Sequence, residues 1–273
     1  MSLKINAFAR LATVLAVAAV LAGCDVSVDG SGGLSFDIAA GKAQDEWSRS
    51  YELAPGGQLE LINVNGRITA EASDGTQVEL KAERTAKAMS DESAQELLGQ
   101  IEMREEVGDG RVRVEVRAPR MNGPKGHEIK WTVRVPKGVH VDLRTVNGGV
   151  RLQGLDGDIR AHSTNGGVNG RGLRASSLEA GVTNGGVDIE LAEAPTSGTF
   201  DLESVNGGVE LAMPADSKAD ISARCTNGGV SVTGLDLVAS GEQTRRRVEG
   251  ALNGGGARVS LSTVNGGVRL RAS

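Results

Sequence analysis

The sequence predicts an all-β protein, a single-stranded parallel β-helix or β-solenoid with rungs of about 18–22 residues. Three observations carry this prediction. The motif Asn-Gly-Gly-Val recurs through the second half of the chain, apolar and polar residues alternate around each copy, and the same residue types return at equivalent positions. Glycine makes up 39 of the 273 residues and aromatic residues only 2%, so the core must be thin and aliphatic.

The first 23 residues have the features of a lipoprotein signal peptide. Lys4 and Arg10 precede an apolar run that is shorter than a membrane-spanning helix requires. The run ends in Leu-Ala-Gly-Cys at positions 21–24, which resembles the lipobox of bacterial lipoproteins and implies cleavage before Cys24 and acylation of its thiol. Asp25 resembles the retention signal of enterobacterial lipoproteins. It favours the periplasmic face of the inner membrane, with the outer membrane as the alternative.

Residues 24–45 are predicted to be a flexible tether, because the glycine-rich stretch at 29–33 has no apolar periodicity. Residues 46–140 are predicted to be an irregular N-terminal β region. Within it, residues 90–107 break the strand pattern: Ala94, Leu97, Leu98 and Ile101 have the spacing of an amphipathic helix, with Ser90 as N-cap. This helix is expected to cover the N-terminal end of the stacked strands, where backbone groups would otherwise lack partners.

Residues 141–273 contain the repeats. Successive copies of the motif follow one another after 18, 19, 22, 21 and 38 residues, and the last interval suggests that one copy has lost its motif. If the rungs stack, the asparagines form a ladder whose side chains bond the backbone at each corner, while the following glycines provide a positive φ. The predicted ladder, with an earlier copy at its start, consists of Asn65, Asn147, Asn165, Asn184, Asn206, Asn227 and Asn265.

The same motif also permits a second fold. Asn-Gly between alternating strands is a strong hairpin signal, so an antiparallel β-sandwich or barrel of Asn-Gly hairpins is the alternative. Stacking is favoured because one valine column recurs without exception, whereas hairpin neighbours need to be complementary rather than identical. The column, three residues after each asparagine, contains Val150, Val168, Val187, Val209, Val230 and Val268.

These columns, together with the lipobox, resemble the bacterial family of β-strand-repeat putative adhesin domains, many of which are lipoproteins. The resemblance covers most of residues 46–273 and is clearest in the repeated Val-Asn-Gly-Gly-Val or Thr-Asn-Gly-Gly-Val. It implies a β-solenoid fold and a role in surface binding. It implies no catalytic residues, because the family is one of unassigned function.

The sequence gives little indication of catalysis. None of His127, His140 and His162 has the neighbours of a zinc site, and Cys225 stands in a small inward column without a base nearby. We therefore expect no enzyme activity, no cofactor and no metal site. Carboxylates on the middle rungs leave a carbohydrate-active β-helix enzyme as an alternative, although aromatic sugar platforms are nearly missing from the repeats.

Recognition is expected on the outward columns of the repeats, since the inward ones are needed for packing. The predicted function is that of a non-enzymatic, lipid-anchored cell-envelope protein that offers a solenoid surface for binding or scaffolding. Its partners would be the membrane, through the lipid, and an envelope protein or glycan; an accessory role in envelope-stress signalling is a further alternative. The net charge of −5 does not favour nucleic acid, and the oligomeric state is not indicated. The candidate binding face consists of Arg160, Glu179, Asp201, Glu203 and Arg224.

The C-terminal end of the stack needs a cover, because only three residues follow Leu270. Residues 236–256, which include the run Arg245 to Arg247, are expected to fold back across this end or to mediate self-association.

Overall fold

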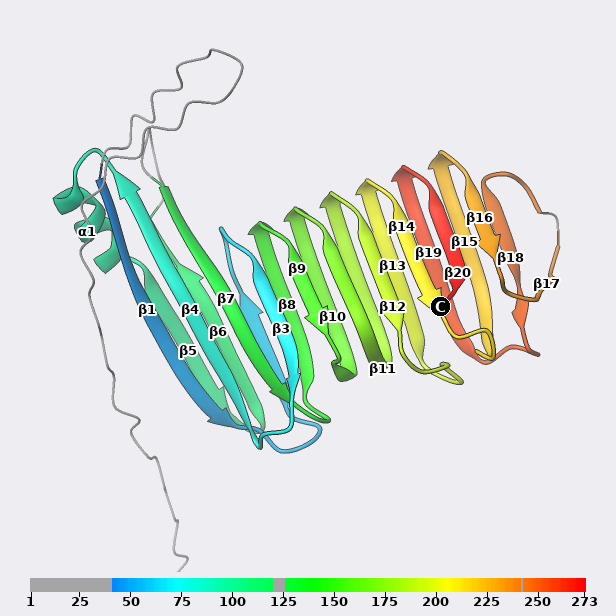
Figure 1. The fold of residues 1–273 in the computed structure, drawn as a ribbon, viewed down its shortest axis with the longest axis horizontal. Helices are drawn as coiled ribbons and strands as arrows, with labels where there is room; N and C mark the ends of the chain where they lie inside the picture. Colours follow the sequence, from blue (N-terminus) through cyan, green and yellow to red (C-terminus); the bar gives the residue numbers. More distant parts are fainter. Residues whose placement is uncertain (1–40, 120–125, 242) are drawn as a thin grey trace, which may run out of the picture.

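The computed structural model describes residues 41–119, 126–241 and 243–273, which form twenty strands and one helix. The strands line up along the long axis of the molecule, with strands of 11 or 12 residues at its N-terminal end (Figure 1). No helix among these residues is long and apolar enough to cross a membrane. The predicted signal peptide 1–23, Cys24, Asp25 and the tether up to residue 40 lie outside the described residues.

The strands form two sheets, called sheet A and sheet B here, and β11 (Val168–Asn184) contributes its first half to sheet A and its second half to sheet B. In spatial order, sheet A contains β1 (Gly41–Glu52), β4 (Gln77–Ala88), β7 (Gly126–Pro136), β3 (Ile68–Ser73), β9 (Val150–Gln153), β11, β12 (Val187–Leu191), β14 (Val209–Met213), β20 (Val268–Ala272) and β16 (Val230–Thr233). Sheet B contains β5 (Glu102–Gly108), β6 (Arg111–Arg117), β2 (Gln58–Ile62), β8 (His140–Asn147), β10 (Asp156–Asn165), β11, β13 (Thr199–Asn206), β19 (Ala257–Asn265), β15 (Ala219–Asn227), β18 (Arg247–Leu252) and β17 (Leu237–Ala239).

The repeat strands pair in parallel and in register, so that each apolar column lies in one line across its sheet. In sheet B, Ile159 pairs with Leu178 and Leu178 with Phe200. In sheet A, Val168 pairs with Val187 and the valine column continues across the neighbouring strands. The inward columns of both sheets belong to one buried apolar cluster. The alternation in sequence is therefore the alternation of inward and outward side chains along each strand.

The Asn-Gly-Gly motif joins a strand of sheet B to a strand of sheet A, and these two strands do not pair with each other in the described chain. This disagrees with the alternative of Asn-Gly hairpins. The first glycine of each motif is needed because adjacent corners lie in close contact. A Cβ atom at Gly207, where φ is +159°, would lie 2.0 Å from Gly185 O of the neighbouring corner. Only glycine lets these corners stack at the spacing of paired strands.

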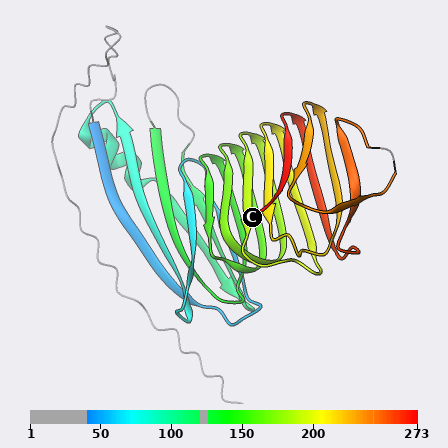
Figure 2. The same cartoon turned by 45° about the vertical axis from the view of Figure 1, so that its right-hand side comes forward.

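The last repeat does not lie at the end of the stack. β19 pairs with β13 on one side and with β15 on the other, and β20 lies in the same way between β14 and β16. The chain thus skips one position, reaches the end, and returns to fill the gap (Figure 2). The long interval before Asn265 is therefore an excursion through β17 and β18, and the expectation of a lost copy is wrong.

The excursion covers the C-terminal end of sheet B. β18 pairs antiparallel with β15, and β17 pairs antiparallel with β18. Residues 236–256 therefore fold back along this end of the stack, which is one of the two roles expected for them.

The N-terminal region departs from the predicted boundaries at two places. Gly41 to Asp45, predicted as part of the tether, form the start of β1 because they pair with β4. The helix α1 (Asp91–Gly99) begins after its N-cap Ser90, as predicted, but it ends well before residue 107. Residues 102–108 form β5 instead, since they pair antiparallel with β6. The helix lies against β1 and β4 at the N-terminal end of the molecule (Figure 1).

Candidate functional site

The predicted asparagines form a continuous ladder along the corners of the stack. Except at Asn65, each Nδ2 donates to the Oδ1 of the neighbouring asparagine over 2.7–2.9 Å. These bonds run between side chains and not to the corner backbone, which corrects the expected pairing. All members except half-buried Asn65 are exposed to solvent. In spatial order the ladder contains Asn227, Asn265, Asn206, Asn184, Asn165, Asn147 and Asn65.

A histidine stands at the N-terminal end of the ladder. The Nε2 atom of His127 lies 3.2 Å from Asn65 Nδ2, so it must accept the last hydrogen bond of the series. Its Nδ1 atom is buried and has no partner among the described residues. Burial lowers the pKa of His127, and the neutral ring that results is the form able to accept this bond.

The backbone of each corner receives hydrogen bonds from a column of small inward side chains. Ser163 Oγ donates to Gly148 O over 2.7 Å, Ser204 Oγ to Gly185 O over 2.8 Å and Thr263 Oγ1 to Gly207 O over 2.7 Å. Cys225 occupies the same column and is only 7% exposed. In this position Cys225 acts as a small packing residue.

The five residues of the candidate binding face all lie on the outward side of sheet B, in two rows. Arg160, Glu179 and Asp201 are consecutive cross-strand neighbours on β10, β11 and β13. Arg160 Nε lies 3.4 Å from Glu179 Oε2. Glu203 and Arg224 lie nearer the corner, separated by β19.

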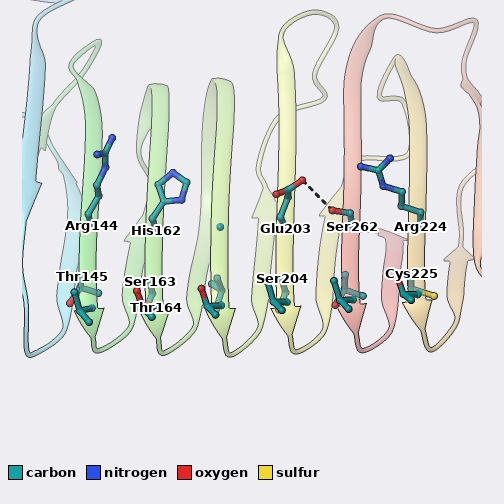
Figure 3. A pocket seen from close by; sticks show the side chains of 18 of the residues that line it. Arg144, Thr145, His162, Ser163, Thr164, Glu203, Ser204, Arg224, Cys225 and Ser262 are labelled. Atoms are coloured by element: carbon teal, nitrogen blue, oxygen red, sulfur yellow. Dashed lines mark hydrogen bonds between the residues drawn. The ribbon is translucent and has the colours of Figure 1, made fainter.

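An open groove of about 730 Å³ crosses this outward side beside the asparagine corner. At its middle the ring of His162 covers Gly181, since a Cβ atom there would lie only 2.7 Å from His162 Nδ1. Figure 3 shows Glu203 accepting a hydrogen bond from Ser262 at 3.3 Å within the groove. The valines of its outermost column are 42–43% exposed. Two outward columns line the groove in strand order: Arg144, His162, Gly181, Glu203, Ser262 and Arg224, and next to the corner Val146, Thr164, Thr183, Val205, Val264 and Thr226.

Two carboxylates on outward positions are buried, which the alternation alone did not predict. Glu60 and Asp142 are neighbours on β2 and β8 and are only 3% and 4% exposed. Arginines shield them: Arg113 Nη1 lies 3.3 Å from Glu60 Oε1, Arg111 also pairs with Glu60, and Arg144 Nη2 lies 2.7 Å from Asp142 Oδ2. The Glu60 contacts join β2 to β6, which are far apart in sequence, whereas the Asp142 pair lies within β8. This cluster stabilises the junction between the N-terminal region and the repeats.

The two aspartates of the Asp156-Gly157-Asp158 turn have structural partners. Asp156 Oδ1 accepts from the backbone N–H of Gly138 over 2.7 Å. Asp158 Oδ1 accepts from the hydroxyls of Ser176 and Ser177 over 2.8 Å and 2.9 Å. Within residues 41–119, 126–241 and 243–273, no three His, Cys, Asp or Glu side chains are grouped as a metal site requires.

Residues 137–271, the stacked half of the molecule, match the sequence profile of a protein family described as Toastrack DUF4097. These residues are a Toastrack domain. The family resemblance predicted from the repeats is thereby confirmed. No curated protein sequence matches the chain significantly.

Two solved structures are similar to the chain. A putative cell adhesion protein from Clostridium sporogenes is 14% identical, with a TM-score of 0.51, and the match covers 84% of this chain and all of that one. A putative adhesin from Bacteroides fragilis is 12% identical, with a TM-score of 0.38, covering 84% of this chain and 97% of that one. The first of these shows that the all-β architecture of the Toastrack domain and the N-terminal region is shared.

Proposed function

We propose that this chain is a non-enzymatic, lipid-anchored protein of the bacterial cell envelope, whose β-solenoid presents a rigid surface for binding or scaffolding. The observation that carries the proposal is the grooved outward side of sheet B. In-register pairing holds its side chains at a spacing of about 4.8 Å from one strand to the next. Such a surface can offer several weak contacts at once, which together give useful affinity.

The carboxylates of the repeats are engaged in ways that support a structural rather than a catalytic role. Arg171 pairs with Asp188, and Arg269 and Arg271 hold Glu210 at 3.0 Å and 2.9 Å. The remaining polar groups of the sheet B face lie in an open groove rather than in an enclosed site. Such a face suits recognition of a partner. The description of the Clostridium sporogenes protein as a cell adhesion protein agrees with this proposal.

The anchor is proposed from the lipobox at positions 21–24. Two or more acyl chains on Cys24 would hold the protein stably on a membrane, which a single chain would not. Its partners would then be the membrane, through the lipid, and an envelope protein or glycan within reach of sheet B. We expect Cys24→Ser to release the protein from isolated membranes without changing its thermal unfolding.

The binding surface is tested by charge reversal on sheet B. A chain with Glu179→Lys, Asp201→Lys and Glu203→Lys should lose partners that are captured by chemical crosslinking in intact cells. The matched control reverses three exposed carboxylates of the N-terminal region, Glu83, Glu96 and Glu102, and should keep them. Equal capture by both variants would contradict the proposal. Turnover of a glycan by the purified chain, lost on changing one carboxylate, would favour an enzyme instead.

A further inference from the structure

The last asparagine corner of the stack is covered by a turn that contains consecutive arginines. Arg246 O accepts from the N–H of Cys225 on β15, and Arg245 O accepts from the N–H of Val230 on β16, both over 2.9 Å. The backbone of the run is therefore fixed to both sheets on either side of Asn227. The side chains of Arg245 and Arg246 remain exposed. The fold thus holds two guanidinium groups on the outside of a rigid corner.

A third exposed arginine, Arg224, lies on the sheet B strand that ends at this corner, and its side chain points away from the corner along the outward side of the sheet (Figure 3). Arg224 on β15 stands directly opposite Arg247 on the antiparallel strand β18. Like charges at directly opposed positions destabilise a strand pair. Arg247 has a partner, Glu249, at 2.7 Å. On its other side Arg224 has only the neutral Ser262 as cross-strand neighbour.

This corner differs from the rest of the described chain, where most arginines lie within 4 Å of a carboxylate. The exceptions outside the corner are Arg67, Arg151 and Arg258, and none of them faces another arginine across a strand pair. Arg224, Arg245 and Arg246 are exposed, and no described carboxylate lies within that distance of them. Exposed guanidinium groups bind carboxylate or phosphate groups, often through two parallel hydrogen bonds.

The arginine corner is continuous with the groove of sheet B. Arg224 and Thr226 line the C-terminal end of the groove, and the side chain of Arg224 stands on its outward side (Figure 3). From there the groove passes Ser262, the carboxylate of Glu203 and the hydroxyl group of Thr183. Such a groove admits a chain-like ligand with many hydroxyl groups. A flat membrane surface could reach only the corner.

We propose that the C-terminal corner and the adjoining groove bind an acidic polysaccharide, whose carboxylate or phosphate groups are held by Arg224, Arg245 and Arg246. Neutral sugars of the same chain lie in the groove, where hydroxyl side chains and the edge of the asparagine ladder offer hydrogen bonds. The inference rests on the proposed function and names the ligand class of that surface. Binding weakens as salt is raised, because exposed ion pairs supply much of it.

The test compares two variants that lose the same charge. One carries Arg224→Gln, Arg245→Gln and Arg246→Gln. The other carries Arg67→Gln, Arg151→Gln and Arg258→Gln, which are likewise exposed. The full chain, purified in a nonionic detergent, is applied to beads that carry polygalacturonate, phosphomannan, neutral dextran or phosphatidylglycerol, and thermal unfolding of each variant is recorded.

We expect the unmodified chain to bind at least one acidic polysaccharide and not dextran. The corner variant should bind about tenfold more weakly, while the control variant changes less than twofold and both unfold at the same temperature. Equal weakening in both variants would show general attraction by net charge and would overturn the proposal. Binding to phosphatidylglycerol beads alone, or to no beads, would overturn it as well. The charge reversal of Glu179, Asp201 and Glu203 detects crosslinked envelope proteins, and its added lysines should not weaken binding to acidic polysaccharide beads. A failure of this ligand class is therefore distinguishable from a failure of the proposed function.

Discussion

The N-terminal region and the Toastrack domain continue the same two sheets but are stabilised differently. In the N-terminal region the longest strands, β1, β4 and β7, pair antiparallel, and charged clusters such as the one around Glu60 bridge distant strands. In the Toastrack domain, parallel strands place identical side chains in line, and glycine, asparagine and hydroxyl residues repeat at every corner. Repetition therefore makes stabilising contacts local and additive, whereas the irregular region depends on particular long-range pairs.

The largest effect is expected from breaking the close contact between corners. Gly207→Ala would place a Cβ atom 2.0 Å from Gly185 O, so the stack must separate at this corner. We expect a loss of about 3–5 kcal/mol in the free energy of unfolding, measured by denaturant titration. The matched control is Gly208→Ala, whose Cβ would have only an ordinary contact at 3.5 Å. Similar losses at both positions would contradict the stacked-corner account.

A smaller loss of stability is expected when the buried carboxylate of Glu60 is removed from the N-terminal region. Glu60→Ala removes the carboxylate that Arg111 and Arg113 share, and leaves Asp142 next to a gap. Because both arginines are partly exposed and can regain water, we expect a loss of about 1–3 kcal/mol. Chemical denaturation measures it, with Glu79→Ala as control, since that carboxylate is exposed. A loss no larger than that of the control would show that the cluster contributes little to the junction.

The asparagine ladder should contribute less per residue, since it is exposed. Asn206→Ala removes two side-chain hydrogen bonds from the middle of the ladder and should cost about 1 kcal/mol. Asn227→Ala removes one bond at the end and should cost about half as much. Thermal unfolding of both variants checks the ratio. Equal and negligible changes would count against a cooperative ladder.

The smallest effect is a pH dependence at the junction of the two regions. The folded protein lowers the pKa of His127 by burying its ring. In the unfolded chain the pKa of a histidine is about 6.5. As the pH falls below this pKa, the unfolded chain therefore binds a proton at His127 more readily than the folded protein does. The stability from this group is present above that pH and is lost as the pH falls toward the folded value. Wild type should thus lose more stability between pH 7.5 and pH 5 than His127→Gln, measured by thermal unfolding. An identical pH profile for the two proteins would contradict this role.

Much of the repeat could be predicted from sequence because its information is local. The valine column, the small inward column around Ser204 and the glycine after each asparagine are visible within about 20 residues. The start of the helix at Ser90 could likewise be predicted from neighbouring residues. Its end could not, because it depends on the pairing of β5 with β6.

Other features depended on contacts between distant parts of the chain. The placement of β19 between β13 and β15 was hidden, since the interval before Asn265 fits both a lost copy and an excursion. The burial of Glu60 was hidden as well, because its cover comes from Arg111 and Arg113 on another strand. The groove was missed because its two outward columns consist mostly of polar side chains, as on an ordinary solvent-exposed face, and its shape depends on the pairing of strands distant in sequence.

The claim that sheet B is the binding surface is tested most directly by photo-crosslinking in living cells. A photoreactive benzoylphenylalanine is placed on β11 at Thr183, in the sheet B groove, or at Asn169, on the sheet A half of the same strand. The account predicts a crosslinked adduct from position 183 and none from position 169. Adducts from position 169 alone, or equally from both positions, would contradict it.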